Sequence, residues 1–180
     1  MRPLTEDLLE LAASPAFGGP EAVVAAIGKV LGDVAPFRFG EVVATTGGDW
    51  RRWPMGAPAE PVAGEELLEW LGGRDSVLRV DDPGELPLRL TREVLAARGL
   101  RSLLAYPFRG AGSVRGAVIL YDEQGWGFAG VATRRVAAIG AMAGHCLWSA
   151  LRVEEAQGEA ERLREALGMR SYRRPEGASG

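Results

Sequence analysis

Side chains that can do covalent or metal chemistry are scarce in this sequence. Its 180 residues include one histidine, His145, and one cysteine, Cys146, which are neighbours in a long apolar segment. Consecutive helical residues point about 100° apart, and a metal site needs two to four converging ligands. A lone cysteine among apolar neighbours is typical of a small buried hydrophobe. We therefore expect no catalytic residue, no metal and no cofactor.

Motifs that signal an enzyme are also missing. The segments GGDWRRW (47–53) and RGAGSVRG (109–116) are rich in glycine, but neither has the spacing of a P-loop or a dinucleotide-binding fingerprint. No GxSxG segment marks a nucleophilic serine. The paired carboxylates Asp81 and Asp82 precede a proline and a glycine, which is typical of an acidic turn. We therefore expect a protein that is not an enzyme.

The overall composition is that of an ordinary globular protein. Hydrophobic residues make up 47% of the chain, charged residues 25%, and the formal net charge is -3, so no positive surplus favours DNA or RNA binding. The sequence contains no run of about 18 apolar residues, the length that would predict a membrane span. Glu6, Asp7 and Glu10 interrupt the apolar pattern of the N-terminus, unlike a signal peptide. We expect a cytoplasmic protein that contacts neither nucleic acid directly nor a membrane.

Hydrophobic periodicity and turn residues divide the chain into helices and strands. The predicted helices are 4–12, 20–31, 64–73, 91–99 (with Thr91 as the N-cap) and a long last helix from about 129 to 167. The predicted strands are 37–45, 50–54, 76–83, 101–109 and 114–122. This order indicates an α+β fold rather than regular βαβ alternation. We expect one domain over residues 1–155, then a charged helical extension and flexible tail over 156–180.

The second half of this pattern resembles the GAF domain. The strand LRSLLAYPFR is followed by a glycine-rich turn, the strand VRGAVILYD, and Phe128 in WGFAG before the last helix. The resemblance is most specific over residues 98–151 and covers about 4–155. It implies an antiparallel sheet of six or so strands. The terminal helices would pack on one face, and loops and short helices would cover a small-ligand pocket on the other.

The resemblance also implies a sensory or regulatory role. GAF domains bind cyclic nucleotides, bilins, haem, amino acids or other metabolites, and signal through their terminal helices to an enzyme or a DNA-binding partner. We expect a small-molecule sensor of this kind, for example the N-terminal sensor of a transcription activator, acting on an output domain or partner protein. The alternative is a ligand-free dimerisation or protein-interaction scaffold of the same fold.

Several specialised GAF activities do not fit the residues present. The cyclic-nucleotide group uses an Asn-Lys pair, and this sequence contains no asparagine. Bilin-binding members attach their chromophore through a cysteine often followed by histidine, whereas His145 precedes Cys146 within the last helix. The sulfoxide-reductase members need several cysteines for thiol exchange, and a single cysteine forms no internal disulfide.

Aromatic and arginine side chains are the candidates for a ligand pocket. Tyrosine combines an apolar body with a polar hydroxyl, which suits a pocket wall. The predicted ligand-binding residues are Trp53, Trp70, Arg79, Tyr106, Phe108 and Tyr121. Few charged residues interrupt this set, so the expected ligand is a small apolar or aromatic molecule with one polar group. The alternative is that these residues belong to the ordinary core or its rim.

Leucines on the first and last helices predict a second functional surface. The candidate dimer-interface residues are Leu4, Leu8, Leu11, Leu147, Leu151, Leu163 and Leu167. We expect a parallel homodimer built on these two helices. In the alternative, the residues before about 151 pack only on the chain's own sheet, which leaves Leu163 and Leu167 unexplained because their surroundings are highly charged.

Overall fold

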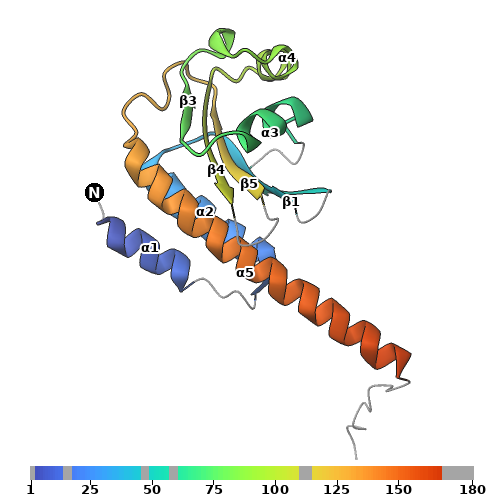
Figure 1. The fold of residues 1–180 in the computed structure, drawn as a ribbon. Helices are drawn as coiled ribbons and strands as arrows, with labels where there is room; N and C mark the ends of the chain where they lie inside the picture. The colour runs from blue at the N-terminus through green and yellow to red at the C-terminus, as the bar shows by residue number, and fades with distance from the viewer. Residues whose placement is uncertain (1–2, 14–17, 46–48, 57–60, 110–114, 168–180) are drawn as a thin grey trace, which may run out of the picture.

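The centre of the molecule is an antiparallel sheet (Figure 1). A computed structural model describes residues 3–13, 18–45, 49–56, 61–109 and 115–167. Its strands are β1 (Phe39–Thr45), β2 (Trp50–Met55), β3 (Leu78–Val80), β4 (Ser102–Arg109) and β5 (Arg115–Asp122). Within the described residues they form one sheet of order β2-β1-β5-β4-β3, with antiparallel neighbours throughout. The sheet thus has five strands rather than about six, and β3 is shorter than expected.

Both faces of this sheet are covered, which explains the apolar character of its central strands. On one face lie α1 (Leu4–Ala12), α2 (Gly19–Val34) and α5 (Thr133–Ala166), the helices nearest the two ends of the chain (Figure 1). On the other lie α3 (Glu65–Gly72) and α4 (Arg89–Ala97). The predicted fold class, α+β with an antiparallel sheet and the terminal helices on one face, is confirmed.

The helix α5 lies very close to the sheet because two of its residues are glycines. A Cβ atom on Gly144 would lie 2.7 Å from Cγ of Phe108, and one on Gly140 would overlap the ring of Tyr106. Both aromatic residues are on β4. Gly140 and Gly144 therefore form a flat surface on α5 against which the aromatic side chains of β4 pack.

On the opposite face, a side chain of α3 caps the N-terminus of α4 and so links the two short helices. The carboxylate of Glu66 on α3 accepts hydrogen bonds from the backbone N–H of Thr91 at 2.9 Å and from its hydroxyl at 3.0 Å. The expectation that Thr91 is the N-cap was wrong: α4 begins at Arg89, and Thr91 lies buried within its first turn. Glu66 satisfies an unpaired donor at that helix N-terminus.

The last helix begins at Thr133, four residues later than expected, because turns occupy the preceding segment. By length and composition α5 is the one described helix that could cross a membrane, but 44% of its most apolar window is buried inside the fold. The buried apolar residues of α5, from Val136 to Leu151, pack in the chain's own core. Beyond Val153 every residue up to Leu167 is exposed or half-buried, and this part of α5 extends away from the sheet (Figure 1).

Candidate functional site

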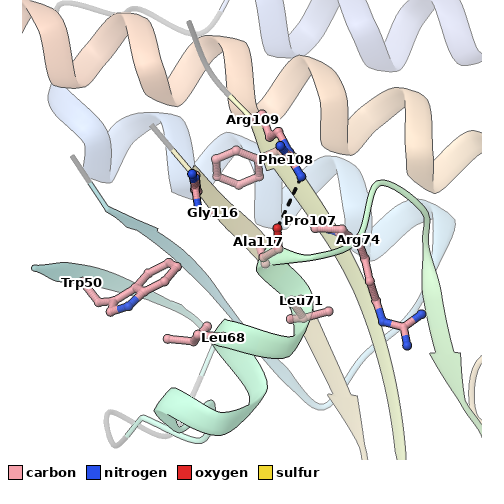
Figure 2. Close-up of a pocket in the computed structure, with 11 residues that line it drawn as sticks. Trp50, Leu68, Leu71, Arg74, Pro107, Phe108, Arg109, Gly116 and Ala117 are labelled. Atoms are coloured by element: carbon pink, nitrogen blue, oxygen red, sulfur yellow. Dashed lines mark hydrogen bonds between the residues drawn. The ribbon is translucent and has the colours of Figure 1, made fainter. Parts of the chain in front are cut away.

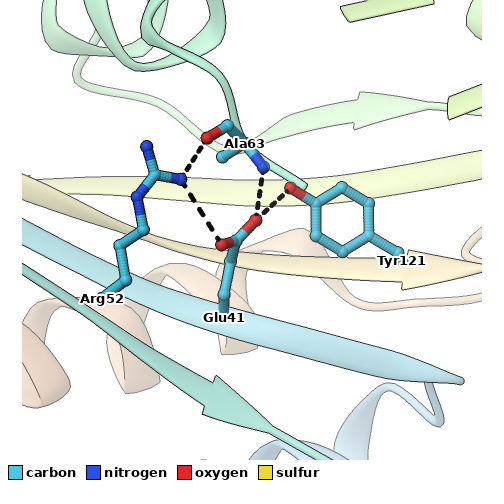
Figure 3. A network of polar contacts seen from close by, with 4 residues as sticks. All are labelled: Glu41, Arg52, Ala63 and Tyr121. Atoms are coloured by element: carbon cyan, nitrogen blue, oxygen red, sulfur yellow. Dashed lines mark hydrogen bonds and ion pairs between the residues drawn. The ribbon is translucent and has the colours of Figure 1, made fainter. Parts of the chain in front are cut away.

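A buried carboxylate lies on the sheet face covered by α3 (Figure 3). Glu41 is on the interior strand β1. Its Oε1 accepts a hydrogen bond from the hydroxyl of Tyr121 at 2.7 Å and another from the backbone N–H of Ala63 at 2.7 Å. Tyr121 is fully buried and stacks on Phe39, with ring centroids 4.7 Å apart. Burial, and then the adjacent Glu41 carboxylate, raise the pKa of the Tyr121 hydroxyl well above its usual value.

Arg52 completes this network from the edge strand β2. Its Nη1 lies 3.8 Å from Oε2 of Glu41 and donates a hydrogen bond to the carbonyl oxygen of Ala63. Both backbone polar groups of Ala63 are therefore held by side chains from the sheet (Figure 3). The network fixes the segment that leads into α3, and α3 covers this face of the sheet.

The predicted ligand-binding residues do not lie together. Tyr121 and Trp70 are on the face covered by α3. Trp53, Tyr106 and Phe108 belong instead to the core that the terminal helices cover, which corrects the expectation that all six residues line one pocket. Of these three, Phe108 also borders a small hollow near the end of the β4–β5 hairpin.

The aromatic residues could not be assigned to a face from the sequence because both faces of the sheet are buried. The alternation along β4 puts Tyr106 and Phe108 together, as expected, but does not say which face they share. The Nε1 of Trp53 donates a hydrogen bond to Glu21 on α2 at 3.2 Å, which ties it to the helical side.

Arg79 forms a link rather than a pocket wall. Its Nε lies 3.0 Å from Oδ2 of Asp81, and its Nη1 donates to the carbonyl oxygen of Ala129 at 3.3 Å. The side chain is exposed on the edge strand β3. It therefore joins this edge to the segment that precedes α5.

Side chains fill the space in which a pocket was expected. The buried leucines of α3, Leu67, Leu68 and Leu71, pack directly against the sheet. One hollow among the described residues is a shallow slot near the end of the β4–β5 hairpin, lined by Trp50, Leu68, Leu71, Gly72, Arg74, Pro107, Phe108, Arg109, Arg115, Gly116 and Ala117 (Figure 2). Its cavity volume is about 10 Å³, roughly what one water molecule needs.

The leucines predicted for a dimer interface fall into two groups. Leu11, Leu147 and Leu151 are buried in the chain's own core, so they are not available to a partner, which corrects that part of the prediction. Leu8 is half-buried, and Leu4 is 36% exposed. Leu163 and Leu167 are 56% and 73% exposed, so they remain candidates.

The exposed part of α5 carries a different apolar seam from the one expected. Residues separated alternately by four and three positions form a heptad stripe along its length: Ser149, Val153, Ala156, Ala160, Leu163 and Leu167. These side chains are half-buried or exposed. The seam runs beside the buried stripe of Leu147 and Leu151 rather than through it.

Two buried charged groups were missed by the sequence analysis. Asp7 on α1 is fully buried, and its Oδ2 accepts hydrogen bonds from Nε of Arg135 at 2.9 Å and from its Nη2. This ion pair joins α1 to the start of α5. For Glu41, a signal was available: it is a single acidic residue within the apolar strand FGEVVAT. Asp7 gave no such signal because acidic residues are common in a first helical turn.

The residues with the greatest chemical reactivity are not assembled into a centre. The thiol of Cys146 lies 3.6 Å from the carbonyl oxygen of Leu11, and burial raises its pKa. His145 is exposed and lies beside Trp148, with ring centroids 6.0 Å apart. In the described part of the chain, no group of three or more histidine, cysteine, aspartate or glutamate side chains could hold a metal ion.

Comparison with known proteins identifies similar solved structures but no similar sequences. No protein-family model matches the sequence, and no curated protein matches it either. Among solved structures, the GAF domain of a GAF/HD-domain protein from Geobacter sulfurreducens is 20% identical, with a TM-score of 0.56 over 82% of this chain and 97% of the other.

Two further structures show the same architecture. The GAF domain of a putative sensor histidine kinase from Pseudomonas syringae pv. tomato is 17% identical, with a TM-score of 0.51 over 93% of this chain and 90% of the other. The free methionine-R-sulfoxide reductase of Neisseria meningitidis is 12% identical, with a TM-score of 0.59 over 83% and 89%. Likeness at these identities shows the fold alone. This chain has the GAF fold.

Proposed function

We propose that this chain is a cytoplasmic, non-enzymatic sensory domain that signals through a parallel homodimer of its last helix. The observation that carries the proposal is the exposed heptad seam on α5. A helix that leaves its own core has to bury an apolar stripe elsewhere, and a second copy of the same helix offers a matching one.

The charges beside the seam favour a parallel pair of identical helices. With Val153, Ala160 and Leu167 at a positions, Ala156 and Leu163 occupy d positions. Glu159 then lies at a g position and Arg164 at the following e position. In a parallel dimer these two meet across the interface, once on each side, and form opposite-charge pairs. The remaining outer positions are mostly charged, as expected for the solvent side of a coiled coil.

The sensory part of the proposal relies on the arrangement of the sheet. Its α3 face carries the buried network of Glu41 and Tyr121, and its other face rests on α5. A ligand that displaced α3 would change the packing of the sheet, and the close contact at Gly140 and Gly144 would pass that change to α5. Occupancy would thereby shift the geometry of the paired helices and act on an output domain or partner protein, a DNA-binding transcription activator being one such output.

The absence of enzymatic activity is part of the same proposal. One structural neighbour is a methionine sulfoxide reductase, but this chain has a single cysteine, and burial raises the pKa of its thiol. A thiol of this kind is mostly protonated and poorly nucleophilic. A disulfide-exchange cycle within one chain needs a second cysteine.

Exchanging the charges at the seam tests the dimer. Arg164→Glu places two acidic side chains opposite each other and should weaken the dimer in sedimentation equilibrium. Glu159→Arg alone should do the same, and the double variant should restore dimerisation. The control is Glu165→Arg, at an outward-facing position. A monomeric wild-type protein, or single variants that dimerise as well as wild type, would contradict the proposed interface.

The second candidate function is a ligand-free interaction scaffold with the same dimer. The filled interior favours it, since the buried Leu67, Leu68 and Leu71 pack against the sheet, and the hollow beside them has a volume of about 10 Å³. The two candidates differ in one measurable property. Ligand occupancy changes the dimerisation constant of a sensor, whereas no metabolite changes that of a scaffold.

A further inference from the structure

A row of side chains crosses four strands at the hairpin end of the sheet. Strand register pairs Trp50 with Thr45, Thr45 with Arg115, and Arg115 with Arg109. Side chains alternate between faces along a strand, so this row shares the α3 face with the buried Ala117, two residues from Arg115. One indole, one hydroxyl and two guanidinium groups therefore lie side by side.

Positive charge in this row is only partly compensated. Arg109 and Arg115 are direct cross-strand partners, and like charges at such positions destabilise a sheet. The Nε of Arg109 lies 3.2 Å from Oδ1 of Asp75, and its Nη2 donates to the carbonyl oxygen of Gly72 at 3.4 Å (Figure 2). Within the part of the chain that the structure describes, Arg115 has no ion-pair partner. A bound anion would relieve the repulsion.

The same place also offers an apolar surface. The slot described above is lined by the ring of Trp50, by Leu68 and Leu71 from α3, and by Phe108 (Figure 2). A third guanidinium, that of Arg74, lies at its margin and stacks on Trp70, with Cζ 3.7 Å from the ring centroid. Because the enclosed volume is so small, a ligand would lie across the open mouth, against the indole ring.

We propose that this row, Trp50 with Arg109 and Arg115, binds a small aromatic carboxylate. The guanidinium groups match a carboxylate, and the Trp50 ring matches a flat apolar body. The carboxylate of Asp75 and the carbonyl oxygen of Gly72 already contact the guanidinium of Arg109, which favours a singly charged ligand over a phosphate dianion. The inference rests on the proposed sensory function and assigns its ligand class.

The slot contacts elements on both faces of the sheet, so ligand binding there could affect both. Leu68 and Leu71 connect the slot to α3, and Glu66 on α3 caps α4. Phe108 connects it to Gly144 of α5. A ligand at this end of the sheet therefore contacts both the covering helix and the residue on which the dimerising helix rests.

Arginine side-chain NMR tests the proposal with phenylacetate and its neutral isostere phenylacetamide. We expect saturable shifts of the Arg109 and Arg115 Nε–Hε signals with phenylacetate and none with phenylacetamide. Arg115→Gln removes one of two opposed like charges, so it should fold, and it should weaken phenylacetate binding about tenfold or more. The control is Arg89→Gln, at an exposed position of α4 outside the row, and it should leave the affinity unchanged.

Three results would overturn the inference, and they are distinguishable from failure of the sensor. Equal binding of phenylacetamide would show that the arginines do not select charge. Inorganic phosphate binding as tightly as phenylacetate would show a general anion site. Absence of saturable shifts would remove the site altogether. The charge-exchange experiment on α5 reports on the proposed dimer independently, because none of its residues lies in the row.

Discussion

The approach of α5 to the sheet makes one substitution especially informative. Gly144→Ala adds a Cβ that would lie 2.7 Å from Cγ and 2.8 Å from Cβ of Phe108. The Cβ of Phe108 is fixed to the backbone of β4, so the ring cannot turn away. Ordinary contacts of this kind begin at 3.4 Å, so the helix and the strand have to separate by about 0.6 Å, the difference between 3.4 Å and the 2.8 Å to the Cβ of Phe108.

The size of the effect follows from two opposing contributions. Alanine is favoured over glycine within a helix by about 0.8–1.0 kcal/mol. Overpacking of a filled core costs about 1–3 kcal/mol and occasionally more. The displaced contact is central to the core shared by α5 and β4, so we expect the steric cost to exceed the gain and the free energy of unfolding to fall by about 1–2 kcal/mol.

Gly158→Ala is the matched control for this variant. Gly158 belongs to the same helix, but no atom lies within 4 Å of the Cβ that it would gain. This variant should therefore be stabilised by up to about 1 kcal/mol. Urea unfolding followed by circular dichroism measures both changes. If Gly144→Ala and Gly158→Ala shift the midpoint in the same direction, the close packing of α5 against the sheet is wrong.

Two further predictions concern the buried polar groups. Tyr121→Phe removes a hydrogen bond to the Glu41 carboxylate and should lower the free energy of unfolding by about 1.5–3 kcal/mol at neutral pH. Because the pKa of Tyr121 is raised in the folded state, its contribution to stability is fully present below about pH 10, the usual value, and is lost as the pH rises above it. The free energies of unfolding of the wild type and of Tyr121→Phe, measured by urea titration, should therefore converge above pH 10. A difference that stays constant with pH would contradict this. Asp7→Ala leaves the guanidinium of Arg135, whose side chain is 10% exposed, without its carboxylate partner. We expect the free energy of unfolding to fall by about 3–5 kcal/mol, or α1 to detach, which would appear as faster hydrogen exchange in residues 4–12. Unchanged stability and unchanged exchange would disprove the ion pair.

Much of the fold could be predicted from the sequence because its local signals agree with each other. The alternation in RSLLAYPFR and VRGAVILYD predicted the β4–β5 hairpin, and the structure pairs these strands along their length. The segment 64–73 predicted α3 almost to the residue. These signals are local, so they hold whatever the tertiary contacts are.

The candidate site was harder to predict because it depends on which face each strand presents. Tyr106 and Phe108 alternate with apolar neighbours that are buried as well, so the pattern does not show which pair faces the helices. The decisive feature is distant in sequence: Gly140 and Gly144 leave room for aromatic rings. The pairing of Arg109 with Arg115 likewise appears only once the strand register is known.

The same limit applies to the last helix. Leu147 and Leu151 have the spacing of an interface, but the chain's own sheet buries them. The seam through Val153 and Leu163 is visible in the sequence only after the buried stripe has been identified and removed. Burial thus separates the residues that hold the domain together from those left for a partner.

Native mass spectrometry of the protein purified from cells can show whether the chain is a dimeric sensor. The same sample, denatured, gives the mass of the chain alone. We expect a dimer that carries extra mass and releases a small aromatic carboxylate on denaturation. A dimer without added mass would favour the scaffold, and a monomer without added mass would rule out a dimeric sensor.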